Sequence, residues 1–385
     1  MTFRDALSAP GFGAIAEFKR RSPSAGDLRP GGDVAAVARG YETAGARAMS
    51  VLVDARFGGS WDDLRAARAA TSLPLLAKGF FTTADDLRAA REAGADAVLL
   101  LLRDLDDATT HDLMRSAASL GLETLVEAHD AAELERAVAL DAEVVGINAR
   151  DLSTFAVDRT AQLELVSHAP RDRVVVAESG IETRAQAAAA ELAGAAAVLV
   201  GSTLMRAADP GATLRDLVRR PLVKVCGLTR ADDVAAAADA GADMVGFILA
   251  DESPRRADAL LDAPPTVLRV AVFVGEAEET DADLAQLYAR EDGHRARDAA
   301  LLRRGERVGT VVDLPWEEAD ATHLRRAAET EGRVMLAGGL GPANVAAAVG
   351  EVRPWAVDSA RSTESEPGVK DHAALRRWVA AARSA

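Results

Sequence analysis

Cysteine, lysine and long apolar runs are all scarce in this sequence. Cys226 is the single cysteine among 385 residues, which excludes an internal disulfide and is typical of a reducing cytoplasm. No apolar run reaches the roughly 20 residues that a membrane-spanning helix needs, and the first residues lack a signal-peptide pattern. We therefore expect a cytoplasmic protein without a membrane partner.

An excess of positive charge is also missing. The formal net charge is −15 at pH 7, and an acidic surface does not attract nucleic acid or anionic membranes. The expected partners are therefore small molecules and not nucleic acid, with anionic substrates allowed where basic groups gather in a cleft. A chain of 385 residues, 49% of them hydrophobic, is long enough to bury two cores.

Lysine occurs only four times among 45 basic residues, as Lys19, Lys78, Lys224 and Lys370. Arginine keeps its proton near neutral pH, whereas a lysine in a dry pocket shifts its pKa and can act as acid, base or nucleophile. Lys19 and Lys78 each end a short apolar run typical of a buried strand, which is where α/β barrels place their chemistry. For Lys224 and Lys370 we favour a surface position, in ion pairs or with extended stems.

The tripeptide Ala-Gly-Ala recurs between alanine-rich helical segments and apolar runs. Glycine permits the left-handed turn that ends a helix, and an apolar strand follows within a few residues. This alternation predicts parallel βα units. The four occurrences are 44–46, 93–95, 193–195 and 240–242.

The number of apolar runs predicts an α/β fold of two TIM-type (βα)8 barrels in tandem. Residues 1–220 hold eight runs, and residues 221–385 hold seven, so the second barrel is expected to be short, with one unit either missing or not recognisable in the sequence. The first eight are 14–18, 49–53, 73–76, 97–101, 124–127, 144–147, 174–177 and 198–200. The other seven are 223–226, 244–249, 267–274, 284–287, 308–313, 334–336 and 355–357. No flexible linker separates the two halves.

Chemically capable side chains gather where the first eight runs end. In a barrel these ends open into one mouth, where buried lysines and glutamates shift each other's pKa. Any one carboxylate alone is more often a structural ion pair than a catalyst, but the gathering predicts an active site. Its members are Glu17, Lys19, Ser22, Lys78, Glu127, Asn148, Arg150, Glu178, Ser179, Gly201 and Ser202.

Two glycine-containing turns, Ser179-Gly180 and Gly201-Ser202, follow the seventh and eighth runs. In barrels the loops at these two positions often bind phosphate through backbone N–H groups. Tight-turn geometry alone would explain either turn. Because both occur at the two expected strand ends, we favour a phosphate site.

Several motifs of the first half resemble those of indole-3-glycerol-phosphate synthase. They are Ile15-Ala-Glu-Phe-Lys-Arg-Arg-Ser-Pro-Ser24, Phe57-Gly-Gly-Ser60, Leu125-Val-Glu-Ala-His129, Gly146-Ile-Asn-Ala-Arg-Asp-Leu152, Val176-Ala-Glu-Ser-Gly-Ile181 and Val200-Gly-Ser202. Members of that family close 1-(2-carboxyphenylamino)-1-deoxyribulose 5-phosphate into an indole, losing carbon dioxide and water without a cofactor. The sequence departs from the usual Lys-Asp-Phe at Lys78-Gly79-Phe80.

The resemblance implies a role for each matching residue. Lys78 would be the general acid that protonates the ketone oxygen, and Glu127 the acid/base partner for dehydration. No metal is implied, since a protonated lysine supplies the electrophile. The implied binding residues are Lys19 with Glu17 for the carboxylate and hydroxyls, Asn148 and Glu178 for the same groups, and Ser22, Gly180, Gly201 and Ser202 for the phosphate; Arg150 and Ser179 are further candidates.

The second half resembles phosphoribosylanthranilate isomerase, the enzyme that makes the synthase substrate by an Amadori rearrangement. The matching motifs are Val223-Lys-Val-Cys-Gly-Leu-Thr-Arg230, Ser253-Pro-Arg255, Leu336-Ala-Gly-Gly-Leu340 and Pro367-Gly-Val-Lys-Asp371. By position, Cys226 would be the general base and Arg255 would hold the anthranilate carboxylate. Gly338 and Gly339 would contribute to a phosphate site, and Asp313 is the candidate general acid.

The motifs of the second half are less complete than those of the first. The family's usual Asp-Val-Ser-Ser-Gly is Asp358-Ser-Ala-Arg-Ser362 here, and Tyr288 stands where histidine is frequent. Cys226 taken alone would be a buried core cysteine.

Three interpretations of the whole chain follow. The leading one is a bifunctional enzyme of tryptophan biosynthesis. Another is a synthase fused to an isomerase-like domain that is inactive or altered in substrate, and the third makes the second half a docking or stabilising module. A reactive Cys226 beside an intact anion site would favour an enzyme, and a filled mouth would favour the module.

Overall fold

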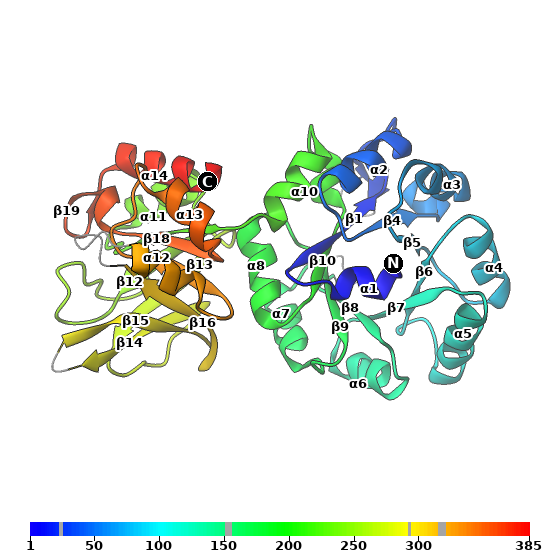
Figure 1. The fold of residues 1–385 in the computed structure, drawn as a ribbon. Helices are drawn as coiled ribbons and strands as arrows, with labels where there is room; N and C mark the ends of the chain where they lie inside the picture. Colours follow the sequence, from blue (N-terminus) through cyan, green and yellow to red (C-terminus); the bar gives the residue numbers. More distant parts are fainter. Residues whose placement is uncertain (23–25, 151–155, 292–293, 315–320) are drawn as a thin grey trace. The chain divides into compact units, whose positions relative to one another are not determined.

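The computed structural model describes residues 1–22, 26–150, 156–291, 294–314 and 321–385 (Figure 1). The chain divides into two compact units, the first formed by residues 1–182 with 190–218 and the second by residues 183–189 with 219–385. None of the helices in the described ranges combines the length and the apolar character that a bilayer crossing requires.

The first unit is built around a closed barrel of eight parallel strands, ordered β1-β10-β9-β8-β7-β6-β5-β4. Its strands are β1 (Gly13–Phe18), β4 (Ala48–Leu52), β5 (Leu75–Lys78), β6 (Ala97–Leu101), β7 (Glu123–Ala128), β8 (Val144–Asn148), β9 (Val174–Glu178) and β10 (Ala197–Val200). A short hairpin, β2 (Arg21–Ser22) with β3 (Gly26–Asp27), follows β1. The eight predicted strands are confirmed.

Helices surround this barrel, except α1, which lies across one end of it, where Phe3 and Leu7 pack with apolar side chains of the strands (Figure 1). The helices are α1 (Phe3–Ser8), α2 (Val34–Thr43), α3 (Trp61–Ala70), α4 (Ala84–Glu92), α5 (Asp107–Ser119), α6 (Ala131–Ala139), α7 (Arg159–His168), α8 (Arg184–Ala193), α9 (Ser202–Arg206) and α10 (Pro210–Val218). Aspartate, serine or threonine precedes nine of these ten helices, all but α9, and accepts a backbone N–H, which satisfies groups that the first helical turn leaves unpaired. The glycine of each Ala-Gly-Ala has a positive φ, between 85° and 116°, as the helix-ending turn requires.

The second unit is also a closed barrel of eight strands, so the second predicted barrel is confirmed and its eighth strand, unrecognised in the sequence, is present. The order is β11-β12-β13-β14-β15-β16-β17-β18. The strands are β11 (Leu222–Cys226), β12 (Met244–Ile248), β13 (Leu268–Val274), β14 (Leu284–Glu291), β15 (His294–Arg303), β16 (Glu306–Asp313), β17 (Val334–Ala337) and β18 (Ala356–Ser359). Its helices are α11 (Ala231–Asp239), α12 (Ala321–Ala328), α13 (Val345–Val352) and α14 (His372–Ser384).

The strand that the sequence did not reveal is β15, which runs antiparallel to both β14 and β16. A parallel strand covered on both faces reads as an apolar run, but β15 carries arginines and an aspartate between its alanines and leucines. Hairpins therefore replace two helical crossovers of a regular (βα)8 barrel. Since β16 is again parallel to β17, its carboxyl end opens at the same mouth as that of β11.

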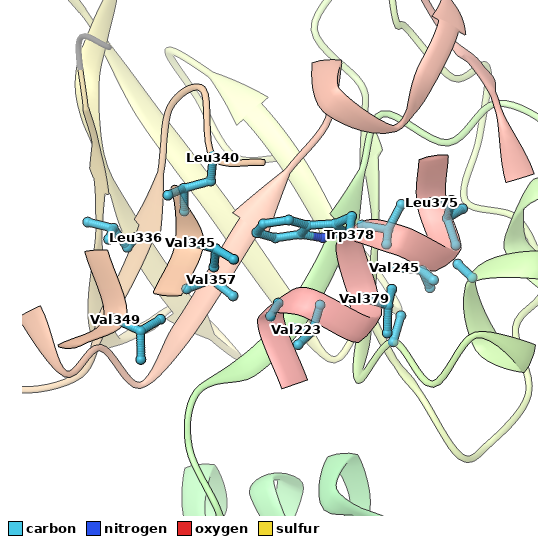
Figure 2. Close-up of a cluster of buried hydrophobic side chains, with 14 of the residues drawn as sticks. Val223, Val245, Leu336, Leu340, Val345, Val349, Val357, Leu375, Trp378 and Val379 are labelled. Carbon is cyan, nitrogen blue, oxygen red and sulfur yellow. The ribbon is translucent and has the colours of Figure 1, made fainter. Parts of the chain in front are cut away.

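The core of the second unit surrounds Trp378, which is fully buried on α14. Figure 2 shows Trp378 among apolar side chains that come from β11, β17, β18 and α13. Its indole N–H points at the backbone oxygen of Lys224, 3.4 Å away. The last helix is thereby fixed to the first strand of its barrel.

We expect Trp378→Ala to lower the free energy of unfolding of the second unit by about 3–5 kcal/mol, because it removes a large buried ring and leaves a cavity. Chemical unfolding of the full chain, followed by circular dichroism, measures this. Arg376→Ala, at an exposed position of the same helix, is the matched control and should change stability by less than about 0.5 kcal/mol. Equal effects of the two substitutions would contradict the packing described.

Candidate active site

The mouth of the first barrel holds an ammonium group surrounded by carboxylates. Lys78 Nζ, at the end of β5, lies 2.5 Å from Glu178 Oε2 and 3.7 Å from an oxygen of both Glu17 and Glu127. The three glutamates come from β9, β1 and β7 and are at most 3% exposed. Four strands therefore bring their charges to one point, as predicted for Lys78, Glu17, Glu127 and Glu178.

Two further predicted residues join this cluster directly. Lys19 Nζ lies 2.7 Å from Glu17 Oε1, and the side-chain amide of Asn148 donates to Glu127 Oε1 at 3.0 Å. Below them the Tyr41 hydroxyl donates to the backbone oxygen of Glu17 at 3.1 Å. Lys19 thus pairs with the carboxylate of Glu17, Asn148 holds that of Glu127, and Tyr41 holds the main chain of Glu17.

Burial and charge divide the protonation states among the three glutamates. Burial favours the neutral carboxyl, but at Glu127 the Lys78 ammonium, His129 and the Asn148 amide together outweigh it and lower that pKa to about 2. At Glu178 burial prevails over the attraction of Lys78 and raises the pKa to about 8. The pKa of Lys78 is raised in spite of its own burial, chiefly by Glu178 and Glu17. At Glu17, Lys19 and Lys78 outweigh burial and lower the pKa. The site therefore holds a protonated lysine beside two ionised carboxylates and one protonatable carboxyl group.

Two glycines leave space for the glutamate side chains of this cluster. The sequence did not reveal this role. A Cβ at Gly146 of β8 would lie 2.2 Å from Glu178 Oε1, and one at Gly201 would lie 2.1 Å from Glu17 Oε1. Gly146 lies inside a motif quoted for another residue, Asn148, and its own role needed the tertiary structure. Gly201 was predicted from phosphate binding, and the structure adds this second requirement.

The residues predicted to bind phosphate lie at the same mouth, on the loops after β1, β8, β9 and β10. Ser179 and Gly180 follow β9 with φ of 70° and 68°, and Gly201 precedes the first residue of α9, Ser202. Ser22 is buried in the hairpin after β1. Arg150 is partly buried beyond β8, where its backbone N–H donates to Asn148 Oδ1 at 3.0 Å.

An aromatic pair near Lys78 was also missed. The rings of Phe57 and Phe80 stack with centroids 6.4 Å apart, and the Arg56 guanidinium lies 3.9 Å from the Phe80 centroid. Phe80 is 39% exposed, unusual for a large apolar side chain two residues from a buried lysine. The exposed Phe80 ring is a candidate surface for stacking of an aromatic ring of a ligand. A sequence does not report exposure, so this candidate could be found only in the structure.

The mouth of the second barrel contains a different set of buried charges. The prediction that Lys224 and Lys370 lie at the surface is wrong, because they are 0% and 5% exposed. Lys224 Nζ donates to Asp358 Oδ2 at 2.9 Å and to Gln286 Oε1 at 2.8 Å. Lys224 lies on a barrel strand, and Lys370 lies beside the mouth of the barrel. Because both are buried, each charge must be paired inside the protein.

Cys226 ends β11 beside this network and is 5% exposed. Burial raises the pKa of its thiol, and the nearby Lys224 opposes that shift. A Cβ at Gly246 of β12 would lie 2.7 Å from Lys224 Cε and 2.8 Å from Cys226 Sγ. Both side chains therefore occupy the space that Gly246 leaves free.

The predicted carboxylate-binding Arg255 already holds a carboxylate. Its Nε lies 2.9 Å from both oxygens of Glu364, and Lys370 Nζ lies 2.9 Å from Glu364 Oε1. On the other side of the mouth, a Cβ at Gly338 would lie 2.4 Å from Asp313 Oδ1, which brings Asp313 against the turn formed by Gly338 and Gly339.

The fold and the first mouth define a class of protein: a barrel enzyme that uses acid–base catalysis on an anionic substrate. Within the described residues no group of three or more His, Cys, Asp or Glu side chains is arranged to hold a metal ion.

Comparison with known proteins identifies the family. Residues 1–217 match the family model of indole-3-glycerol phosphate synthase, and the chain belongs to that family. The indole-3-glycerol phosphate synthase of Nocardioides sp. is 50% identical over 208 residues, which cover 54% of this chain and 80% of the relative. That of Mycobacterium ulcerans is 46% identical over 214 residues, covering 55% of this chain and 79% of the relative.

The second unit matches another enzyme family. Residues 281–381 match the model of N-(5'-phosphoribosyl)anthranilate isomerase. The solved phosphoribosyl anthranilate isomerase of Thermus thermophilus is 28% identical and covers 43% of this chain and 99% of its own, with a TM-score of 0.35. By the family models, one chain joins domains of two enzyme families of tryptophan biosynthesis.

We expect Gly146→Ala to lower synthase kcat about 10²-fold, because the new methyl group displaces Glu178 from Lys78 and small misplacements of a catalytic group cost about this much. Steady-state kinetics with a thermal unfolding curve measures the loss. Gly40→Ala is the matched control, since a Cβ there meets nothing within 4 Å. An unchanged kcat in Gly146→Ala would show that the site tolerates the displacement.

Proposed function

We propose that the chain catalyses two reactions of tryptophan biosynthesis, Amadori isomerisation of N-(5-phosphoribosyl)anthranilate in the second barrel and decarboxylating ring closure of the product in the first. The observation that carries the synthase is the Lys78 ammonium held by Glu17, Glu127 and Glu178 at one barrel mouth. The substrates are small phosphorylated anthranilate–ribose compounds, and we place the reactions in the cytoplasm.

In the synthase step, Lys78 donates a proton to the ketone oxygen while the aromatic carbon bonds to the ketone carbon. The surrounding glutamates keep this proton on Lys78 until the oxygen develops negative charge, and the buried site strengthens the attraction to that oxygen. Carbon dioxide then leaves the ring carbon. Glu127, ionised in the free site, is the acid/base partner for the loss of water.

Binding of the substrate falls to the remaining residues of the first mouth. Lys19, paired with Glu17, faces the substrate carboxylate and hydroxyls, and Asn148 and Glu178 orient the same groups. The backbone at Gly180 and Gly201 brings N–H groups to the phosphate. The other proposed contacts are Ser22, Arg150, Ser179 and Ser202.

In the isomerase step, Cys226 acts as the base that moves a proton and Asp313 as the acid that opens the ribose ring. Arg255 binds the anthranilate carboxylate, and Gly338 with Gly339 contributes to the phosphate site. Lys224 supplies the positive charge that favours the Cys226 thiolate.

A second candidate for this barrel is an isomerase-like domain without the activity. Two observations favour it: Glu364 already engages Arg255, and burial raises the pKa of Cys226. In the first, a glutamate of the protein occupies the arginine that would bind the substrate carboxylate. In the second, burial disfavours the thiolate that would act as the base. The isomerisation assay below decides between the two.

Lys78→Arg should lower synthase kcat by about 10²–10⁴, because arginine keeps the positive charge but does not release its proton. Stopped-time assay of indole-3-glycerol phosphate formation gives kcat, and circular dichroism checks the fold. Isomerisation should be unchanged in this variant. A kcat within threefold of the parent would remove Lys78 from proton transfer.

Cys226→Ala should abolish isomerisation and leave ring closure intact, because the two sites lie in separate barrels. The parent's isomerisation rate should rise with pH, since the thiolate is the active form and burial has raised the thiol pKa. Consumption of N-(5-phosphoribosyl)anthranilate measures both effects. If the parent chain closes the ring but does not isomerise, the second candidate replaces the first.

A further inference from the structure

One charged side chain beside the first mouth has no role in the reaction as described. His129 follows β7 and lies between two carboxylates. Its Nε2 is 3.2 Å from Glu127 Oε1, and its Nδ1 is 3.0 Å from Glu133 Oε2 on α6. Glu133 Oε2 also accepts the backbone N–H of His129 at 2.8 Å, so α6 holds both the ring and the main chain of this residue.

Nδ1 is hydrogen-bonded to Glu133, whereas Nε2 has no hydrogen bond among the described residues and faces Glu127 as an ion pair. A carboxylate beside each nitrogen stabilises the doubly protonated ring, the form that carries a positive charge. Burial opposes the charge, but Glu127 and then Glu133 raise the pKa of His129 to about 9. The ring is therefore a cation at neutral pH. It places a second positive charge beside Glu127, in addition to that of Lys78.

The two oxygens of Glu127 have different surroundings. Oε1 accepts the Asn148 amide at 3.0 Å and faces His129. Oε2 is buried, lies 3.7 Å from Lys78 Nζ, and has no hydrogen-bond partner among the described residues. Oε1 is thus anchored, whereas Oε2 has the Lys78 ammonium and the protonatable Glu178 carboxyl as its neighbours.

We infer that His129 and Glu133 form a positioning pair for Glu127, which fixes Oε1 and leaves Oε2 as the oxygen that exchanges the proton during dehydration. The inference rests on the proposed role of Glu127. His129 does not touch the substrate; it acts through Glu127, as a carboxylate–histidine pair orients a neighbouring group. The charged groups around the pair are Glu127 and Glu133 in contact with the ring, and Lys78 and Glu178 beyond Glu127.

The first experiment measures the pKa of His129 and does not depend on catalysis. Histidine titration by NMR of the full chain, with His129 assigned through His129→Gln, should give a pKa near 9. Both Glu133→Gln and Glu127→Gln should lower it, since each removes one negative charge. A value unchanged in both variants overturns the inference, whatever the activity of the enzyme.

The second experiment separates positioning from general support of the fold. His129→Gln and Glu133→Gln should each lower synthase kcat about tenfold, with KM for the carboxyphenylamino-deoxyribulose phosphate within twofold. In His129→Gln the acidic limb of the kcat profile should move upward by about one pH unit, because loss of a neighbouring cation raises the pKa of Glu127. In Glu133→Gln the His129 ring is still protonated in acid, so the limb should stay in place. Glu135→Gln, exposed on the same helix, is the control and should match the parent.

A fall in kcat of His129→Gln without a shift of its acidic limb overturns the inference and makes His129 a structural residue. Full activity of Glu127→Gln would overturn the proposed role of Glu127 and the inference with it. If Glu127→Gln is inactive while both pair variants retain the parent's kcat and pH profile, only the inference fails. Thermal unfolding of each variant separates these results from misfolding.

Discussion

The first barrel depends on one buried ammonium group. Removing a lysine from water costs several kcal/mol unless opposite charges replace the solvent, and Lys78 is surrounded by Glu17, Glu127 and Glu178 from three other strands. The arrangement exists only when the barrel closes in the observed register. The glycines at 146 and 201 are part of it, because a methyl group at either position would occupy the place of a carboxylate oxygen.

The second barrel satisfies its buried charges in another way. Lys224 pairs with Asp358, and Glu364 is shared by Arg255 and Lys370. In the first mouth Glu127 and Glu178 each keep one buried oxygen without a hydrogen bond in the described residues; in the second mouth Asp358 does so. More of the buried charges of the second mouth are thus paired within the protein. A substrate carboxylate there must compete with Glu364 for Arg255.

Much of the fold follows from local patterns in the sequence. A parallel strand covered on both faces must be apolar throughout, so the eight strands of the first barrel and seven of the second were visible as runs. Strand β15 was not, because it pairs in two hairpins and keeps polar residues such as Asp298 and Arg303. The surface assignment of Lys224 failed for a related reason: a charge inside an apolar run is compatible with burial only if a partner exists, and its partner Asp358 lies 134 residues further along the chain.

The sequence alone determined the two-barrel architecture, the residues at the strand ends and the resemblance to two enzyme families, because these depend on residue type and spacing. Tertiary structure decided how the charges are shared. Which carboxylate is neutral, which oxygen of Glu127 is anchored, where His129 points and which glycines clear the site all depend on distances between residues far apart in the chain. Electrostatic interaction falls with distance and with solvent exposure, and neither quantity is present in a linear sequence.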